Sequence, residues 1–121
     1  PGGRLDFCLR GVELPSCRVE TKSVTLVEGD AAVFPDAPTS RGTKHLRHLM
    51  EHVRTGGRAA ILFIVLRSDA KCFSPNEKND PVFAKTLREA VSSGVAAMAV
   101  KCRVNKQKIE LLDEIPTKLA T

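Results

Sequence analysis

Two acidic residues and a lysine near the start of the chain have the types and spacing of a divalent-metal site. Asp6 lies in the stretch Arg4–Arg10, and Glu20 and Lys22 lie in the stretch Cys17–Ser23. Both stretches predict strands, and because side chains alternate along a strand, an antiparallel hairpin would place all three on one face. A register in which paired position numbers sum to 26 would place Asp6 directly opposite Glu20.

Paired carboxylates of this kind would bind a hard divalent cation. Carboxylate oxygens are ligands that Mg²⁺ and Mn²⁺ prefer, so Asp6 and Glu20 are candidate metal ligands. Lys22 could orient an attacking water and neutralise the charge that builds on a phosphodiester, which makes all three residues candidate catalytic residues. Acidic and basic residues are also ordinary on the polar face of a half-exposed hairpin, where opposite charges stabilise strand pairing. The spacing leaves both interpretations open.

The segments around these residues resemble the sugar fermentation stimulation protein A family. The resemblance rests on Arg4–Phe7, Val19–Leu26, Phe34–Leu46, Phe73–Pro75, Leu87–Ala90 and Gly94–Val95, and so covers nearly the whole chain. It implies DNA binding and a domain similar to the PD-(D/E)XK nucleases, whose motif acids would fall on Asp6 and Glu20 and whose lysine would fall on Lys22. Leu5 stands where the motif has proline and Thr21 where the family more often has valine, and neither difference removes a functional group.

The resemblance also implies how the chain is organised. Positions 1–121 would form a single nuclease-like domain, a fragment that lacks the family's N-terminal OB-like domain. The expected fold class is α/β, a mixed β-sheet flanked by helices with a restriction-endonuclease-like core that is incomplete at the N-terminus.

The pattern of elements favours the same class. Strands are predicted at Val24–Val27 and Ala31–Phe34, at the apolar run Ala59–Leu66, which suits a strand covered on both faces, and at Val95–Val104 and Ile109–Leu112. One helix should run from a cap at Thr39 or Ser40 to about Thr55 and end at Gly56-Gly57. A second should begin with Asp80 as cap and Pro81 at the first position, and end at Gly94. Strands followed by alternating strand and helix indicate a mixed sheet with helices against it.

The first predicted helix carries a second group of candidate binding residues. Arg41, Lys44 and His48 fall on the face opposite the apolar stripe and could contact nucleic-acid phosphates, although surface helices need a polar face in any case. The string from His48 to His52 also matches the H-x-x-E-H motif of inverted zinc peptidases, a remote alternative because no third ligand is apparent.

Composition sets broad limits. The chain has 121 residues, 42% of them hydrophobic, which suffices for one core, and its net charge of +5 favours an anionic partner only weakly. Five phenylalanines without Trp or Tyr provide few platforms for stacking bases. The four cysteines lack zinc-finger spacing and are expected to be reduced thiols of a cytoplasmic protein. The longest apolar run is too short to cross a membrane.

The sequence therefore predicts a DNA-binding protein with a nuclease-like, Mg²⁺- or Mn²⁺-dependent phosphodiesterase centre at Asp6, Glu20 and Lys22. The alternative that the family implies is a non-catalytic DNA-binding regulator of the transcription of sugar metabolism genes. The residues do not distinguish these two functions, and they indicate no oligomeric state.

Overall fold

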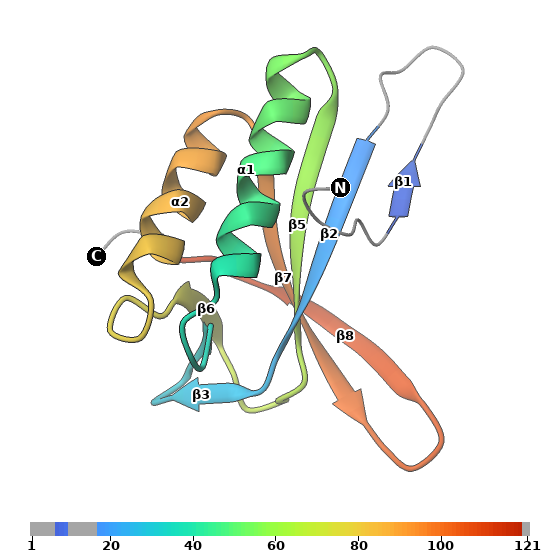
Figure 1. Ribbon diagram of the computed structural model, residues 1–121. Coiled ribbons are helices and arrows are strands. Elements are labelled where there is room, and N and C mark those ends of the chain that lie inside the picture. The colour runs from blue at the N-terminus through green and yellow to red at the C-terminus, as the bar shows by residue number, and fades with distance from the viewer. Residues whose placement is uncertain (1–6, 10–16, 120–121) are drawn as a thin grey trace.

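The computed structural model describes residues 7–9 and 17–119 (Figure 1). Within these ranges two helices accompany strands of two sheets. In chain order the elements are β1 (Phe7–Leu9), β2 (Cys17–Val24), β3 (Leu26–Glu28), β4 (Ala31–Phe34), α1 (Ser40–Arg54), β5 (Arg58–Val65), β6 (Cys72–Pro75), α2 (Pro81–Ser92), β7 (Ala96–Val104) and β8 (Ile109–Ile115).

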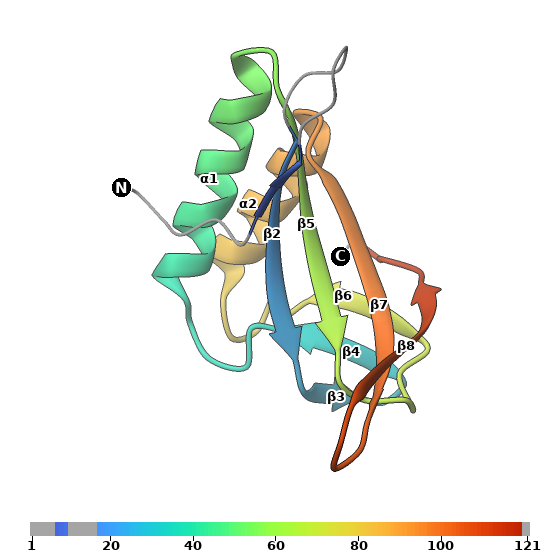
Figure 2. The same cartoon turned by 90° about the vertical axis from the view of Figure 1, so that its right-hand side faces the viewer.

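The larger sheet is mixed and has the strand order β1-β2-β5-β7-β8. Its central strands β2, β5 and β7 are parallel, and β1 and β8 pair antiparallel at the two edges. Helices α1 and α2 lie side by side against one face of this sheet (Figures 1 and 2). This arrangement confirms the predicted α/β class, a mixed sheet flanked by helices.

The smaller sheet has the order β3-β4-β6. The sequence predicts a single sheet, and two features explain the difference. Only Thr25 separates β2 from β3, so the chain passes directly from one sheet into the other. Strand β6 is not predicted from sequence, because a four-residue segment ending in Pro75 has neither the length nor the alternation of a typical strand.

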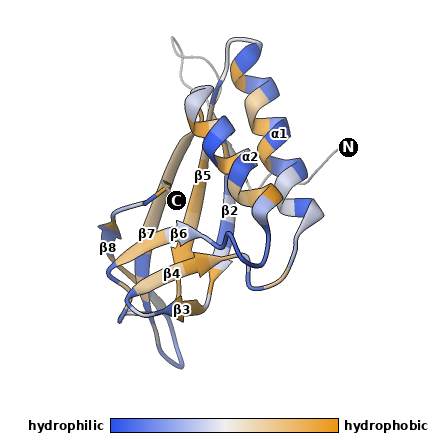
Figure 3. Ribbon diagram, turned by 90° about the vertical axis from the view of Figure 1, so that its left-hand side faces the viewer, coloured by the Kyte–Doolittle hydropathy of each residue, from blue (hydrophilic) through white to orange (hydrophobic). Residues whose placement is uncertain are grey.

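The hydrophobic core lies between the larger sheet and the helices. Alternate residues of β5 point into it, and Ile61 and Phe63 are fully buried there. The predicted apolar stripes of the helices complete it with Leu46 and Leu49 from α1 and Phe83, Leu87 and Ala90 from α2. In Figure 3 the hydrophobic colours accordingly concentrate in the strands, while the helices alternate between hydrophobic and hydrophilic.

The other face of the larger sheet is less covered than predicted. The apolar run of β5 predicts a strand buried on both faces, yet Leu62 and Ile64 are only half-buried. Met98, paired with Leu62 on the next strand, is 39% exposed. Both helices pack on the opposite face, so these residues are shielded mainly by their neighbours within the sheet.

The ends of both helices follow the predicted chemistry. Thr39 caps α1, since its Oγ1 accepts the Gly42 N–H at 2.9 Å. Asp80 caps α2, since its Oδ1 accepts the Phe83 N–H at 2.9 Å. Gly56 and Gly94 follow the two helices with φ of 97° and 109°, values at which glycine is strongly favoured.

Neither helix of the described ranges is long and apolar enough to cross a membrane.

Candidate functional site

A buried charged cluster joins strand β2 to helix α1. Glu20 and Lys22 lie on the face of β2 that the helices cover, since their parallel neighbours on β5 are the core residues Ile61 and Phe63. The third member is His45 of α1. Glu20 is 2% exposed, His45 is 1% exposed, and Lys22 is half-buried. Glu20 and Lys22 were predicted to share one face of the strand, and the structure places them together.

The three groups are within hydrogen-bonding or ion-pairing range of one another. Glu20 Oε1 lies 3.0 Å from His45 Nδ1 and 3.6 Å from Lys22 Nζ. Lys22 Nζ in turn lies 2.8 Å from His45 Nδ1. The lysine can donate to Nδ1 only if that nitrogen has a free lone pair, whereas Nδ1 can donate to Glu20 only if it carries a proton. The cluster therefore has two alternative hydrogen-bonding arrangements, with His45 common to both.

The position of Glu20 has an energetic consequence. An ionised carboxylate removed from water is strongly destabilising unless charged or hydrogen-bonding groups compensate for the lost hydration. Lys22 and His45 provide such compensation from one direction, while apolar side chains such as Phe63 and Val24 surround the same strand face. A fold that only needed a stable strand would place an apolar residue at this position.

Asp6, the other predicted metal ligand, lies outside the described residues. The pairing of β1 with β2 is nevertheless informative. Phe7 pairs with Val19, Cys8 with Arg18 and Leu9 with Cys17, which is the register in which position numbers sum to 26. Within residues 7–9 and 17–119, His, Cys, Asp and Glu form no group of three that could hold a metal ion. Of the two predicted metal ligands, the described residues therefore include only Glu20.

His45 is the member of the cluster to which the sequence analysis assigned no role. Its position contained a signal that could have identified it. His45 falls on the apolar face of α1 with Gly42, Leu46 and Leu49, all of them buried. A histidine in an otherwise apolar stripe needs a polar partner when the helix packs, and an acid on the strand beneath is a suitable one.

The predicted phosphate-binding residues lie on the outer side of α1. Arg41 and Lys44 are exposed in its first turns, and His48 is half-buried one turn further on. This face is separate from the buried cluster, although Lys44 immediately precedes His45 in the chain.

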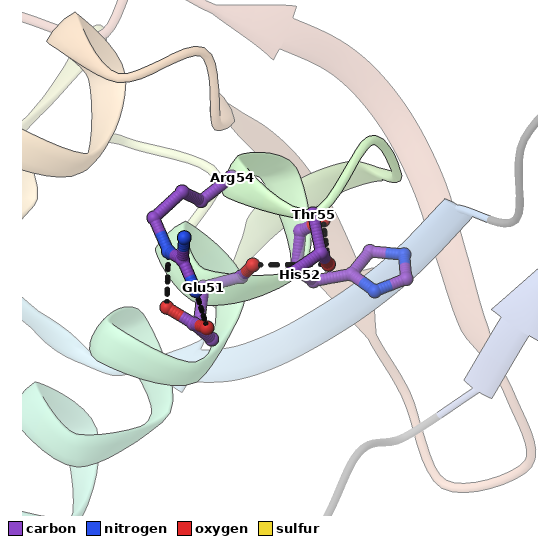
Figure 4. Close-up of polar contacts among 4 residues, drawn as sticks. All are labelled: Glu51, His52, Arg54 and Thr55. Atoms are coloured by element: carbon purple, nitrogen blue, oxygen red, sulfur yellow. Dashed lines mark hydrogen bonds and ion pairs between the residues drawn. The ribbon is translucent and has the colours of Figure 1, made fainter.

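The H-x-x-E-H string does not form a metal site. Glu51 forms an ion pair with Arg54, with Nε 2.8 Å from Oε2, and the hydroxyl of Thr55 donates to the carbonyl of His52 at 3.1 Å. Figure 4 shows the His52 ring pointing away from Glu51. The ring lies instead over Gly57, where an added Cβ would come within 2.1 Å of Nε2. Glu51 and His52 thus make their contacts at the C-terminal end of α1.

Cysteines 17, 72 and 102 are free. Cys17 pairs across the strands with Leu9. Burial raises the pKa of the Cys102 thiol above its ordinary value.

Residues 2–108 match the family model described as the sugar fermentation stimulation protein RE domain. The chain belongs to this family. Among its relatives is the sugar fermentation stimulation protein homolog of Moorella thermoacetica, which is 49% identical over 116 residues, covering 96% of this chain and 50% of the relative. The homolog of Geobacter sulfurreducens is 48% identical over 113 residues, covering 93% and 48%.

A solved structure of Pyrococcus furiosus SfsA in complex with Ca²⁺ has the same fold. It superposes with a TM-score of 0.88 at 34% identity, and the match covers 95% of this chain and 50% of that one. The chain thus spans about half the length of the relatives it matches.

Proposed function

We propose that this domain acts on DNA through a metal-dependent phosphodiesterase centre of the PD-(D/E)XK type. The observation that carries the proposal is that buried Glu20 and half-buried Lys22 lie on one face of β2, at the spacing that the nuclease motif requires and in contact with His45. Charged groups in a protein core destabilise the fold. Proteins therefore keep them mainly where they serve a function.

The donor chemistry of the site fits a hard divalent cation. Glu20 supplies a carboxylate oxygen, and we propose Asp6 as the second ligand because the register seen between Phe7 and Leu9 would bring position 6 opposite Glu20 if it continued. The description of the Pyrococcus relative as a Ca²⁺ complex supports divalent-cation binding in the family. We infer Mg²⁺ or Mn²⁺ as the cofactor of this chain, since both accept carboxylate and water ligands.

Each side chain then has a distinct task. A bound cation would polarise a water molecule and a phosphate oxygen. Glu20 would hold the ion, and Lys22 would orient the attacking water and reduce the negative charge that develops on the phosphate. His45 contacts both of these side chains and acts as a positioning residue, because it limits the rotamers that each can adopt. Arg41, Lys44 and His48 would contact DNA phosphates beside the centre.

Calorimetry of Mn²⁺ binding tests the ligand assignment. We expect Asp6→Asn and Glu20→Gln each to abolish measurable binding, because a single carboxylate holds a hydrated divalent ion weakly. Lys22→Met should leave binding largely intact. Glu28→Gln is the matched control, since Glu28 is an exposed glutamate of β3. Unchanged affinity in both acid variants would exclude the site.

Cleavage assays test the activity itself. Plasmid and short duplex DNA incubated with Mg²⁺, Mn²⁺ or EDTA should give products only with the metal, and Lys22→Met should eliminate them while retaining the metal. Metal binding and DNA binding without products would instead favour the second candidate, a non-catalytic DNA-binding regulator of sugar metabolism genes. The observation that favours this candidate is that Lys22 and His45 already compensate the charge of Glu20 within the protein, as in a structural ion cluster.

A further inference from the structure

The β7–β8 hairpin extends beyond the sheet to which it belongs. Pairing of β7 with its inner neighbour β5 ends at Lys101, opposite Val65. Beyond that point β7 continues to Val104 and pairs only with β8. Figures 1 and 2 show the resulting two-stranded arm projecting past the ends of β2 and β5. At about 3.3 Å per residue, positions 101–105 extend it by roughly 13 Å.

The arm is basic at its tip. Positions 101–108 contain four basic residues and no acidic residue, namely Lys101, Arg103, Lys106 and Lys108. Lys106, Gln107 and Lys108 are exposed, and in Figure 3 the end of the hairpin has hydrophilic colours. The acidic residues of β8 begin at Glu110, which lies 4.0 Å from Arg103, and continue at Asp113 and Glu114, nearer the body of the protein. Positive charge therefore dominates the outer end of the arm.

The turn that presents these charges is ordered by its own hydrogen bonds. Asn105 Oδ1 accepts the backbone N–H groups of Gln107 and Lys108, each at 2.9 Å, and the Asn105 N–H donates to the Lys108 carbonyl at 3.1 Å. Asparagine side chains commonly stabilise turns in this way. Lys106 and Lys108 thus lie on an ordered turn. Binding of a partner by these lysines would cost less conformational entropy than binding by lysines on a disordered tail.

We propose that the tip of the β7–β8 hairpin is a second DNA-contacting surface, in which Lys106 and Lys108 bind phosphates of duplex DNA that lies across the domain. A two-stranded β-ribbon fits the major groove of B-DNA, which is about 12 Å wide and about 8.5 Å deep. Lysines on such a ribbon reach the phosphates on the groove walls and release counterions. The inference rests on the proposed DNA binding, but it does not require cleavage or a bound metal.

The test measures affinity for a 20-base-pair duplex as a function of salt, by fluorescence anisotropy on the whole 121-residue chain. The hairpin variant is Lys106→Gln with Lys108→Gln. The matched control is Lys78→Gln with Lys85→Gln, which removes the same charge from side chains that are 80% and 75% exposed and lie outside the hairpin. Thermal melting of each variant checks that the fold is intact, as expected for exposed positions.

We expect the hairpin variant to lower affinity by up to about tenfold per lysine at about 0.1 M salt, and to flatten the slope of log affinity against log salt by about 1.8, since each phosphate contact releases roughly 0.9 counterion. The control should retain the slope. If both double variants lose affinity equally and flatten the slope equally, net charge alone accounts for the effect and the hairpin inference is wrong.

The outcomes separate the inference from the proposed function. Duplex binding that depends on the hairpin, with no cleavage in any metal, would contradict the phosphodiesterase centre and support the hairpin surface. Metal-dependent cleavage that is equally efficient in wild type and hairpin variant, at equal affinity, would overturn the hairpin inference alone. Absence of duplex binding by the wild-type chain, or tighter binding to an acidic polypeptide or to RNA, would overturn it as well.

Discussion

The carboxylate of Glu20 is compensated by residues from two different elements. Lys22 comes from the same strand, two positions along, whereas His45 comes from a helix that begins after the whole of the smaller sheet's first hairpin. Because burial weakens the hydration of all three groups, each depends on the others more than surface charges would. Removing one partner leaves the others with an uncompensated desolvation cost.

His45→Ala should therefore lower the free energy of unfolding by about 2 kcal/mol or more, from the lost hydrogen bond together with the cavity that a buried side chain leaves. Urea denaturation measures this change. His48→Ala is the control on the same helix, since His48 is only half-buried, and it should cost less than about 1 kcal/mol. Equal losses in the two variants would show that the cluster contributes no special stability.

The cysteine thiols should differ in their reactivity. Cys102 is 1% exposed and its pKa is raised by burial, whereas Cys17 is half-buried. Iodoacetamide at pH 8 should therefore modify Cys17 well before Cys102 in the native protein, because the thiolate is the reactive form. Peptide mapping by mass spectrometry separates the sites, and in urea the difference should disappear.

The raised pKa of Cys102 also makes the stability of the protein depend on pH. A thiol whose folded pKa lies above its unfolded pKa contributes stability that is fully present below the unfolded value and is lost as pH rises through the folded value. Cys102→Ala should therefore reduce the loss of stability on the alkaline side.

Among the elements, the two helices are coupled where they begin. Asp80 caps α2, and its second oxygen, Oδ2, accepts the backbone N–H of Thr39 at 2.7 Å. Thr39 is itself the cap of α1. One carboxylate thus fixes the starts of both helices, and with them the position of the first turns of α1 that carry Arg41, Lys44 and His45.

Asp80→Ala should destabilise the protein by about 1–2 kcal/mol for the cap, and by about 1 kcal/mol more for the lost bond to Thr39. Thermal or urea unfolding measures the sum. Asp113→Ala, at an exposed position of β8, controls for the change of charge. A loss no larger than that of an ordinary cap would show that the contact between the two helix starts is energetically neutral.

This coupling marks the limit of what could be predicted from sequence. Local chemistry predicts the caps at Thr39 and Asp80, the glycine helix ends and the shared face of Glu20 and Lys22, because each depends on neighbours within a few positions. The contacts of His45 with Glu20 and of Asp80 with Thr39 depend on how distant elements pack. Strand β6 could not be predicted for a related reason, since its backbone pairs with distant residues of β4 and with Thr117.

For the whole molecule, the proposed DNA surfaces lie on different elements. Arg41 and Lys44 are exposed at the start of α1, while Lys106 and Lys108 lie at the tip of the β7–β8 hairpin. If one duplex spans both, their contributions to counterion release add.

Replacing Arg41 and Lys44 with Gln should flatten the salt slope by about 1.8, and combining this pair with the hairpin pair should flatten it by about 3.6. Both losses should be similar on unrelated duplex sequences, since phosphate contacts carry little sequence information. Anisotropy titrations on two unrelated duplexes measure this. A combined variant no weaker than either pair would indicate that the two surfaces never engage the same DNA molecule.

The parallel pairings of the two sheets have a kinetic consequence. Cys17 lies beside Arg58, Ala31 beside Cys72 and Ala60 beside Ala96, and at least one other element separates the partners of each pair along the chain. Such pairings close long loops before they gain stabilising contacts, which makes folding slow compared with that of helical bundles. His45 cannot meet Glu20 and Lys22 until α1 has docked on β2. In stopped-flow refolding, helical circular dichroism should accordingly recover ahead of protection of the Cys102 thiol, and the charged cluster would be among the last parts of the domain to assemble.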